Sequence, residues 1–550
     1  MFRKRKILSP DDPLLLNNHR RPVTRREFIS QGFMTGAGTI LGGSIFSLFA
    51  NPQQARAALS ADLATLKDSC GIRTIGAGKV PFICFDLAGG ANISGSNVLV
   101  GGPGGQRDLL TTAGYNKLGL PGDRIPMINA AAGQNSFINS DLGLDFHSDS
   151  AMLAGILERV NSAAGNINGA VIPARSDNDT GNNPHNPMYG IYGAGADGQL
   201  LTLIGSQSSV SGGNSMPVDS LVDLGVRPTK VDRTSDVTGL VDTGQLVGLL
   251  DQSDVVYVME AVQRISDQKL GRSGLNWDNK PITADEVVKE MVSCGYVKAA
   301  DIADQYGNPD ILNPREDCEI VGDNGIFSMQ ELDSDREFEK TAAIMKLVVN
   351  GYAGAGTVTM GGFDYHTGDR ATGEARDLRA GRCIGACLEY AARRGVPLMV
   401  YVFSDGSVFS NGSIDNTAGG GGKGVWTGDN SSTAASYMLV YDPVEAPSIF
   451  SGGAGTLAQH QQIGSMRSDA SVDTASSLAA NNVNLLVETI LLNYVALHGS
   501  DRTDFENIFS RVGVNHGLGN AALMDSLTAF NPLPSIQGGM ITPPSQLICT

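Results

Sequence analysis

Charged and aromatic side chains are scarce in this 550-residue chain, at 18% and 6% of the residues, and only two residues are tryptophan. The seven cysteines include no Cys-x-x-Cys pair, which excludes the common structural zinc and thioredoxin-type motifs. There is no phosphate-binding Gly-x-x-x-x-Gly-Lys-Ser/Thr loop and no haem, copper or dinucleotide signature. Any chemistry must therefore come from carboxylates, histidines and hydroxyls on a globular framework.

The N-terminal segment carries paired arginines, Arg25 and Arg26, ahead of an apolar run over 33–50. Glycines dilute this run, and Ala55-Arg56-Ala57 follows it as a small-x-small cleavage site. The segment resembles a twin-arginine export signal. This resemblance implies a twin-arginine translocase as partner, a cargo exported in folded form and a periplasmic or extracellular location. The alternative is an uncleaved membrane anchor; we expect cleavage after Ala57 and no stable membrane span in the mature chain.

The mature chain is strongly acidic. Removal of residues 1–57 leaves 31 Lys and Arg against 54 Asp and Glu, a formal charge of −23. Such a field repels phosphate backbones and anionic lipid, so we expect neither nucleic acid nor a membrane surface as a partner. The 69 glycines exceed the usual share of about 7%, which indicates many loops around a compact framework.

The cysteines do not define a disulfide framework, because their number is odd and their spacing irregular. Cys383 and Cys387 are four residues apart in a predicted helix, which favours a buried apolar pair over a metal or redox pair. One disulfide between distant cysteines remains open after export, and the sequence does not choose it.

Alternating strand and helix patterns predict an α/β fold. Apolar runs predict strands buried on both faces, and helical periodicity or caps predict the helices between them. The predicted strands are 80–85, 169–172, 356–360, 398–403 and 437–441, and the predicted helices include 150–160, 335–350, a segment from Thr283, one through Ala380 to Ala391, and 483–495.

We predict a largely parallel central sheet with helices on both faces and a helical insertion. The predicted boundaries are 1–57 for the signal peptide, 58–205 for the first part of the α/β domain, 206–324 for the helical insertion or cap, and 325–550 for the second part.

Three predicted strands each end in an acidic residue beside glycines: Asp86, Asp364 and Asp405. The carboxyl ends of parallel strands share one edge of a sheet, where ligands collect. His366 lies two residues after Asp364, so the pair could form half of a Zn²⁺ or Mn²⁺ site. His185, in a polar loop after another strand, is the best candidate for a second imidazole. We therefore predict a divalent metal held by these five side chains.

Simpler interpretations remain for each residue. Aspartate after a strand also suits turns and helix N-caps, and His366 could be an exposed loop residue. His147 could merely orient a turn. His498 follows a helix stripe and is interpreted as a partner of the helix dipole. Asp177-x-Asp179 is more typical of an Asx-rich turn than of a calcium loop.

Several short motifs occur in the order found in a large, mostly uncharacterised group of twin-arginine-exported bacterial proteins: Leu87-Ala88-Gly89-Gly90-Ala91-Asn92, Asn183-Pro184-His185, Gly361-Gly362-Phe363-Asp364-Tyr365-His366 and Phe403-Ser404-Asp405-Gly406. The chain resembles this group from about Val80 onward. Its members look like relatives of the alkaline phosphatase and sulfatase superfamily. The resemblance implies an α/β sandwich with metal ligands at strand ends and metal-assisted hydrolysis of a small anionic phosphate or sulfate ester.

The chain also departs from the family pattern. Ser404-Asp405-Gly406-Ser407-Val408 stands where members carry Ser-Glu-Phe-Gly-Arg, and Asp429 lacks the histidine expected after it. No activated nucleophile is evident; Ser94 and Ser96 are the candidates after the first strand. Two hypotheses follow: an exported metal-dependent ester hydrolase, or a catalytically degenerate exported binding or assembly protein on the same fold.

Overall fold

The computed structural model describes residues 60–70, 78–131, 133–176, 183–241, 252–272, 283–306, 309–368, 370–499 and 502–544. The predicted signal residues Arg25, Arg26, Ala55 and Ala57 and the loop residues Asp177 and Asp179 lie outside these ranges. The chain divides into two compact units. The α/β unit comprises Arg73–Asp242 and Pro309–Thr550, and the helical unit comprises Met1–Ile72 and Thr243–Asn308.

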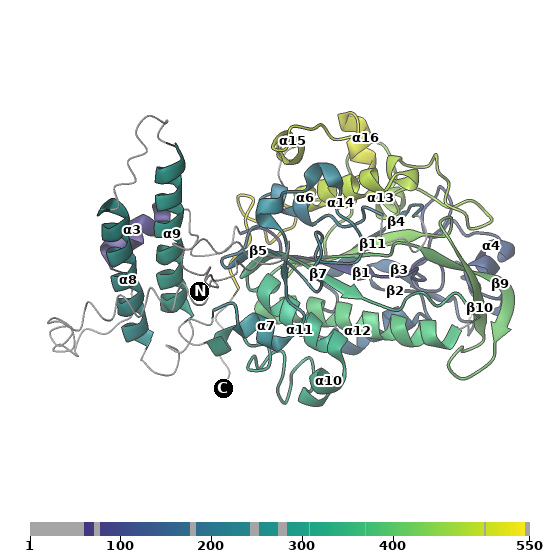
Figure 1. Ribbon diagram of the computed structural model, residues 1–550. Helices are drawn as coiled ribbons and strands as arrows, with labels where there is room; N and C mark the ends of the chain where they lie inside the picture. The colour runs from purple at the N-terminus through teal and green to yellow at the C-terminus, as the bar shows by residue number, and fades with distance from the viewer. Residues whose placement is uncertain are drawn as a thin grey trace, which may run out of the picture. The chain divides into compact units, whose positions relative to one another are not determined.

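A seven-stranded sheet forms the centre of the α/β unit (Figure 1). The strands in spatial order are β4 (Ile167–Pro173), β11 (Ala435–Tyr441), β8 (Leu398–Phe403), β1 (Phe82–Leu87), β7 (Ala353–Met360), β5 (Leu201–Gly205) and β6 (Thr229–Lys230). β1 lies between β7 and β8 and is parallel to both, whereas β11 is antiparallel to β4 and β8. The predicted α/β fold with a largely parallel sheet is confirmed.

Helices cover both faces of the sheet, as predicted (Figure 1). One face packs against α6 (Met188–Gly193), α14 (Val483–Leu497) and α15 (Arg502–Ser510), which share an apolar core with β1 and β8. The other face packs against α11 (Arg336–Val349) and α12 (Arg370–Arg394), and α12 also packs on α5 (Ala151–Arg159). The helices predicted at 150–160, 335–350, 380–391 and 483–495 are therefore confirmed.

Glycines allow α5 and α12 to lie in backbone contact. A Cβ on Gly155 would lie 2.2 Å from Leu378 O, and one on Gly381 would lie 2.0 Å from Met152 O. Any side chain at these positions would separate the two helices. The helix through Cys383 and Cys387 thus packs at close range, and both thiols are fully buried and unpaired, as predicted.

Two small hairpins complete the strands of the α/β unit. β9 (Ser407–Asp415) pairs with β10 (Lys423–Asn430), and β2 (Ile138–Leu142) pairs with β3 (Leu144–His147). The glycine run at 419–422 connects β9 to β10. The remaining α-helices of this unit are α4 (Thr112–Lys117), α7 (Thr234–Thr238), α10 (Met329–Ser334), α13 (Leu457–Gln461) and α16 (Ala521–Ser526).

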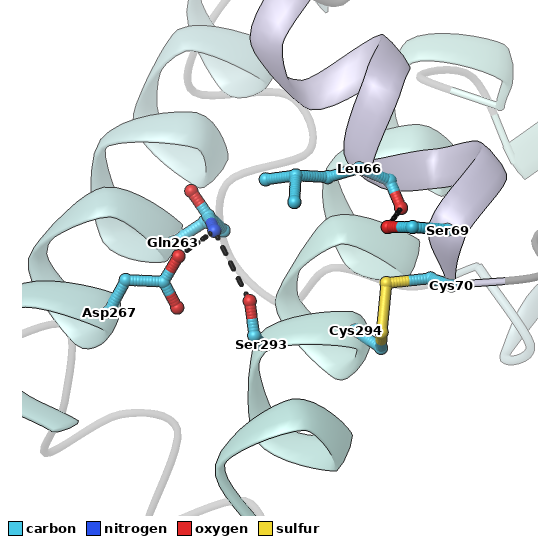
Figure 2. The surroundings of a disulfide bond; sticks show 7 residues. All are labelled: Leu66, Ser69, Cys70, Gln263, Asp267, Ser293 and Cys294. Carbon is cyan, nitrogen blue, oxygen red and sulfur yellow. Dashed lines mark hydrogen bonds between the residues drawn. A yellow bond between two sulfur atoms is a disulfide. The ribbon is translucent and has the colours of Figure 1, made fainter. Parts of the chain in front are cut away.

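The helical unit contains α3 (Ala61–Ser69), α8 (Gln252–Arg272) and α9 (Thr283–Gln305). A disulfide joins Cys70, just after α3, to Cys294 in α9 (Figure 2). The helix predicted from Thr283 is thus observed, although the unit spans Thr243–Asn308 rather than 206–324 and includes the segment before Ile72. Within the described ranges, no helix combines the length and hydropathy required to cross a membrane.

Candidate functional site

Asp86 lies near the end of β1 with its side chain fully buried. Its Oδ2 accepts hydrogen bonds from the backbone N–H groups of Asn214 and Ser215 at 2.6 and 2.8 Å. Its Oδ1 accepts from Ser215 Oγ at 3.2 Å. Both carboxylate oxygens are therefore engaged by the loop that follows β5. We call the edge where β1, β7 and β8 end the carboxyl edge.

Asp405, two residues beyond β8, lies at the same edge and is also buried. Its Oδ1 accepts from Gly89 N at 2.8 Å and its Oδ2 from Asn214 Nδ2 at 3.2 Å. Asn214 thus contacts both carboxylates through its backbone and its side chain. The expectation that Asp86 and Asp405 meet at one edge holds in the structure.

Burial above all, together with the negative charge of Asp405, raises the pKa of Asp86 to about 6, although the hydrogen bonds from Ser215 and Asn214 act in the opposite direction. The carboxyl group of Asp86 therefore changes charge closer to neutral pH than an exposed aspartate does. The charge at the carboxyl edge therefore depends on pH, although the Asp86 carboxyl group has no contact with solvent.

The loop over 206–215 closes this edge over Asp86. A Cβ on Gly213 would lie 2.7 Å from Asp86 Oδ2 and 2.9 Å from Thr357 Cγ2. Glycine is required here because the loop backbone lies against the carboxylate. Sequence reasoning missed Asn214 and Ser215; the only signal was the glycine pair that precedes them.

His185 is buried, and its ring stacks on Phe403 with centroids 5.6 Å apart. Ser176 Oγ lies 2.7 Å from His185 Nε2 and donates to the backbone carbonyl of Asp405 at 2.9 Å. Asn183 Nδ2 donates to the same carbonyl at 3.0 Å. His185 is therefore connected to Asp405 through Ser176, a residue that the sequence analysis did not identify.

Burial lowers the pKa of His185 to about 3, so the imidazole is neutral at physiological pH. Its Nδ1 is buried without a hydrogen-bond partner among the residues that the structure describes. A neutral imidazole can accept a proton or bind a metal, but a group with so low a pKa is a weak base.

Asp364 and His366 follow β7 and contact each other through Oδ1 and Nδ1. Their side chains are 55% and 27% exposed, which separates them from the buried group around Asp86. A Cβ on Gly89 would lie 2.6 Å from Asp364 N, so the segments after β1 and β7 lie in contact. The two side chains lie together, as their spacing predicts, and they contact each other directly.

Ser94 and Ser96 are buried and bonded within the protein. Ser94 Oγ donates to the carbonyl of Thr433. Ser96 Oγ accepts from Asn92 Nδ2 and, at 3.0 Å, from Arg370 Nη2. No histidine contacts either hydroxyl in the described part of the chain, so neither serine has the adjacent base that a nucleophile requires.

A second buried polar network supports the segment that carries Asp364 and His366. Tyr365 OH donates to Asp377 Oδ1 at 3.1 Å and accepts from Asn92 N at 2.8 Å. Asn97 Nδ2 donates to Asp377 Oδ2 at 2.7 Å. Burial, followed by the charge of Glu374, raises the pKa of Asp377 to about 7. These bonds tie the loops after β1 and β7 to α12.

The five predicted metal ligands do not form a closed centre. Across the described ranges, no group of three or more His, Cys, Asp or Glu side chains is arranged to hold a metal ion. Asp86 is engaged by three donors from the loop, whereas Asp364 and His366 form an exposed pair. The donor set as arranged here therefore does not fit a Zn²⁺ or Mn²⁺ ion held by all five side chains.

A cavity of about 40 Å³ lies at the opposite edge of the sheet. Pro81, just before β1, and Ala353, at the start of β7, contribute to its lining. None of the predicted site residues lines it.

No protein-family model, curated protein or solved structure matches this chain. Functional inference therefore rests on the geometry of the carboxyl edge.

Proposed function

We propose that this is an exported binding or assembly protein on an alkaline-phosphatase-like fold whose catalytic constellation is incomplete. The observation that carries the proposal is that the candidate catalytic groups are bonded to the protein itself. Asp86 holds the loop over 206–215, while Ser94 and Ser96 hold Thr433 and Arg370. These contacts support a role for the carboxyl edge in folding rather than in turnover.

Two features of the sequence support the rest of the proposal. Arg25 and Arg26 precede an apolar run, which favours export by the twin-arginine route to the periplasm or beyond. The missing histidine after Asp429 is the departure expected of a degenerate relative. Of the five predicted metal ligands, Asp364 and His366 retain the most solvent exposure, so a partner would contact the edge there.

A screen of small phosphate and sulfate esters with Zn²⁺, Mn²⁺, Mg²⁺ and Ca²⁺ tests this function. We expect no turnover above that of buffer under any condition. Metal-dependent turnover that disappears in both Asp364→Ala and His366→Ala would overturn the proposal. Each variant should first be shown to unfold at the same denaturant concentration as the parent protein, so that a loss of activity reports on the edge.

Ester hydrolysis is the second candidate, favoured by the 2.7 Å contact between Ser176 Oγ and His185 Nε2. A hydroxyl beside an imidazole is the contact of a nucleophile with its base, although the Ser176 hydroxyl here donates its proton to the carbonyl of Asp405. The low pKa of His185 weakens this interpretation, because an effective base has a pKa near the working pH. Metal-independent turnover abolished by Ser176→Ala would favour this second function.

A further inference from the structure

Few apolar contacts hold α3 to the helical unit. The helix has nine residues, fewer than the roughly 12 to 15 that an isolated helix needs to be even marginally stable in water. Leu63 is its only fully buried apolar side chain, and Lys67 is its only other buried residue among those whose burial is described. The attachment of α3 to the helical unit therefore depends mostly on polar contacts and on the disulfide.

The amino end of α3 is held by polar contacts with α8, one of them to the buried carboxylate of Glu260. Ser60 N donates to Glu260 Oε1 at 2.7 Å, and Arg264 Nη2 donates to Ser60 Oγ at 2.7 Å and to Asp62 Oδ1 at 3.1 Å. Asp62 and Arg264 are largely exposed, so water screens their attraction. The exposed ion pair therefore holds the helix weakly, and the hydrogen bond from Ser60 N to Glu260 is the one sheltered contact at this end.

The carboxyl end of α3 is held by α9. Lys67 Nζ donates to Asp301 Oδ1 at 2.5 Å, with both side chains at least 90% buried. One turn further, the disulfide joins Cys70 to Cys294 across 224 residues of sequence. A cross-link between such distant residues strongly restricts the unfolded chain, and it holds the end of α3 covalently on α9, so we expect the disulfide to dominate this attachment.

The contacts between α8 and α9 do not involve α3. Val255 and Val256 of α8 pack with Ala303 of α9 in a small apolar cluster. Gln263 of α8 donates to Asp267 at 2.5 Å and to Ser293 of α9 at 3.5 Å, beside the disulfide in Figure 2. These contacts between α8 and α9 therefore remain when the disulfide is open.

We propose that the Cys70–Cys294 disulfide is a redox latch that fixes α3 on α9 in the oxidised protein and releases it in the reduced one. Both cysteines are half-buried rather than sealed in the core, which gives a thiol reagent access. The latch closes by exchange with a disulfide-bearing oxidant. The Cys70–Cys294 bond forms, the oxidant's S–S bond breaks, and its two sulfurs take up the two thiol protons.

The latch has a consequence that rests on the proposed export. α3 begins four residues after Ala57, the predicted end of the signal. In the reducing cytoplasm the disulfide would be open and α3 undocked. The signal, which precedes α3, would then be accessible to the translocase. Oxidation after export would then form the disulfide and fix α3 on α9 of the mature protein.

Hydrogen exchange of the full chain tests the latch. We compare the oxidised protein with the Cys70→Ser/Cys294→Ser double variant, because Cys318 is also disulfide-bonded and chemical reduction would open that bond too. We expect the amides of α3 to exchange at least tenfold faster in the double variant, while those of α8 and α9 change less than twofold. Ser69→Ala is the matched control: its hydroxyl bonds only within α3, to Leu66 O, and the disulfide stays intact.

Protection of α3 within twofold of the parent in the double variant would overturn the latch, and so would equal loss of protection in all three helices. A separate measurement addresses export. In cells, the precursor of an Arg25→Lys/Arg26→Lys variant should carry free thiols at positions 70 and 294, whereas the exported protein should not. A disulfide already present in the retained precursor would remove the link to export while leaving the hydrogen-exchange result intact.

Discussion

Burial governs the ionisation of the polar side chains in the α/β unit. The pKa values of His185, His147 and His498 are lowered to about 3, 4 and 4, chiefly by desolvation. His498 accepts from Val80 N at 3.0 Å and contacts Tyr494 O at 2.8 Å. With Nε2 accepting, Nδ1 donates to Tyr494 O, so His498 caps the carboxyl end of α14 as a neutral hydrogen-bonding group.

The pH dependence of stability follows from His185. Its folded pKa of about 3 lies below that of an unfolded histidine, so the unfolded chain binds more protons between these values. The stabilising contribution of neutral His185 is present above about pH 6.5 and is lost as the pH falls toward 3. Urea unfolding of the parent and of His185→Gln between pH 7 and 4.5 should therefore give a smaller decrease for the variant. Parallel curves for the two proteins would contradict the assignment.

Asp86 should be important for stability, because it accepts two backbone N–H groups that have no other partner in the loop. In Asp86→Asn, the amide NH₂ group would either face the two backbone N–H groups, which are themselves donors, or leave one of them without an acceptor. We expect the free energy of unfolding to fall by about 1–3 kcal/mol, measured by denaturant titration. Asp123→Asn, at an exposed position, is the control and should change it by less than about 0.5 kcal/mol. Equal effects of the two substitutions would refute an anchoring role.

Among the elements, buried strands were the easiest to predict. Val80-Pro81-Phe82-Ile83-Cys84-Phe85 is continuously apolar because β1 is covered on both faces and paired on both sides. β6 was missed because it has only two residues. β5 was missed although residues 200–204 form an apolar run interrupted only by Thr202. The β9–β10 hairpin was missed because the segment between its strands is rich in glycine, which is typical of a loop.

The loop over 206–215 offers a test at the scale of one element. In Gly213→Ala the new methyl group would overlap Asp86 Oδ2 and Thr357 Cγ2, which lie 2.7 and 2.9 Å from the Cβ position. We expect a loss of about 1–3 kcal/mol in unfolding free energy. Gly122→Ala is the matched control, because nothing lies within 4 Å of its Cβ position. A Gly213→Ala protein as stable as the control would mean that the loop does not rest on Asp86.

For the whole molecule, the sequence predicts the fold class better than the site. Apolar strands and amphipathic helices encode the sheet and its layers locally, and they led to the correct class. The site depends on distant contacts: Asn214 lies 128 residues from Asp86 and 191 from Asp405. No local pattern signals that an asparagine in a serine-rich loop will contact both carboxylates.

The candidate site illustrates the same limit. The strand ends correctly brought Asp86 and Asp405 to one edge, and the spacing of Asp364 and His366 correctly placed their side chains together. The sequence could not show that the carboxylate of Asp86 accepts hydrogen bonds from two backbone N–H groups, because these bonds depend on the path of the loop after β5.

Metal content is the most direct test of the central claim that the carboxyl edge is bonded to the protein itself. The mature protein, exported through its own signal, is equilibrated with micromolar Zn²⁺ or Mn²⁺, passed through a desalting column and analysed for metal, alongside Asp364→Ala and His366→Ala. The account predicts less than about 0.1 metal ion per chain in all three proteins. One ion per chain in the parent, lost in both variants, would contradict it.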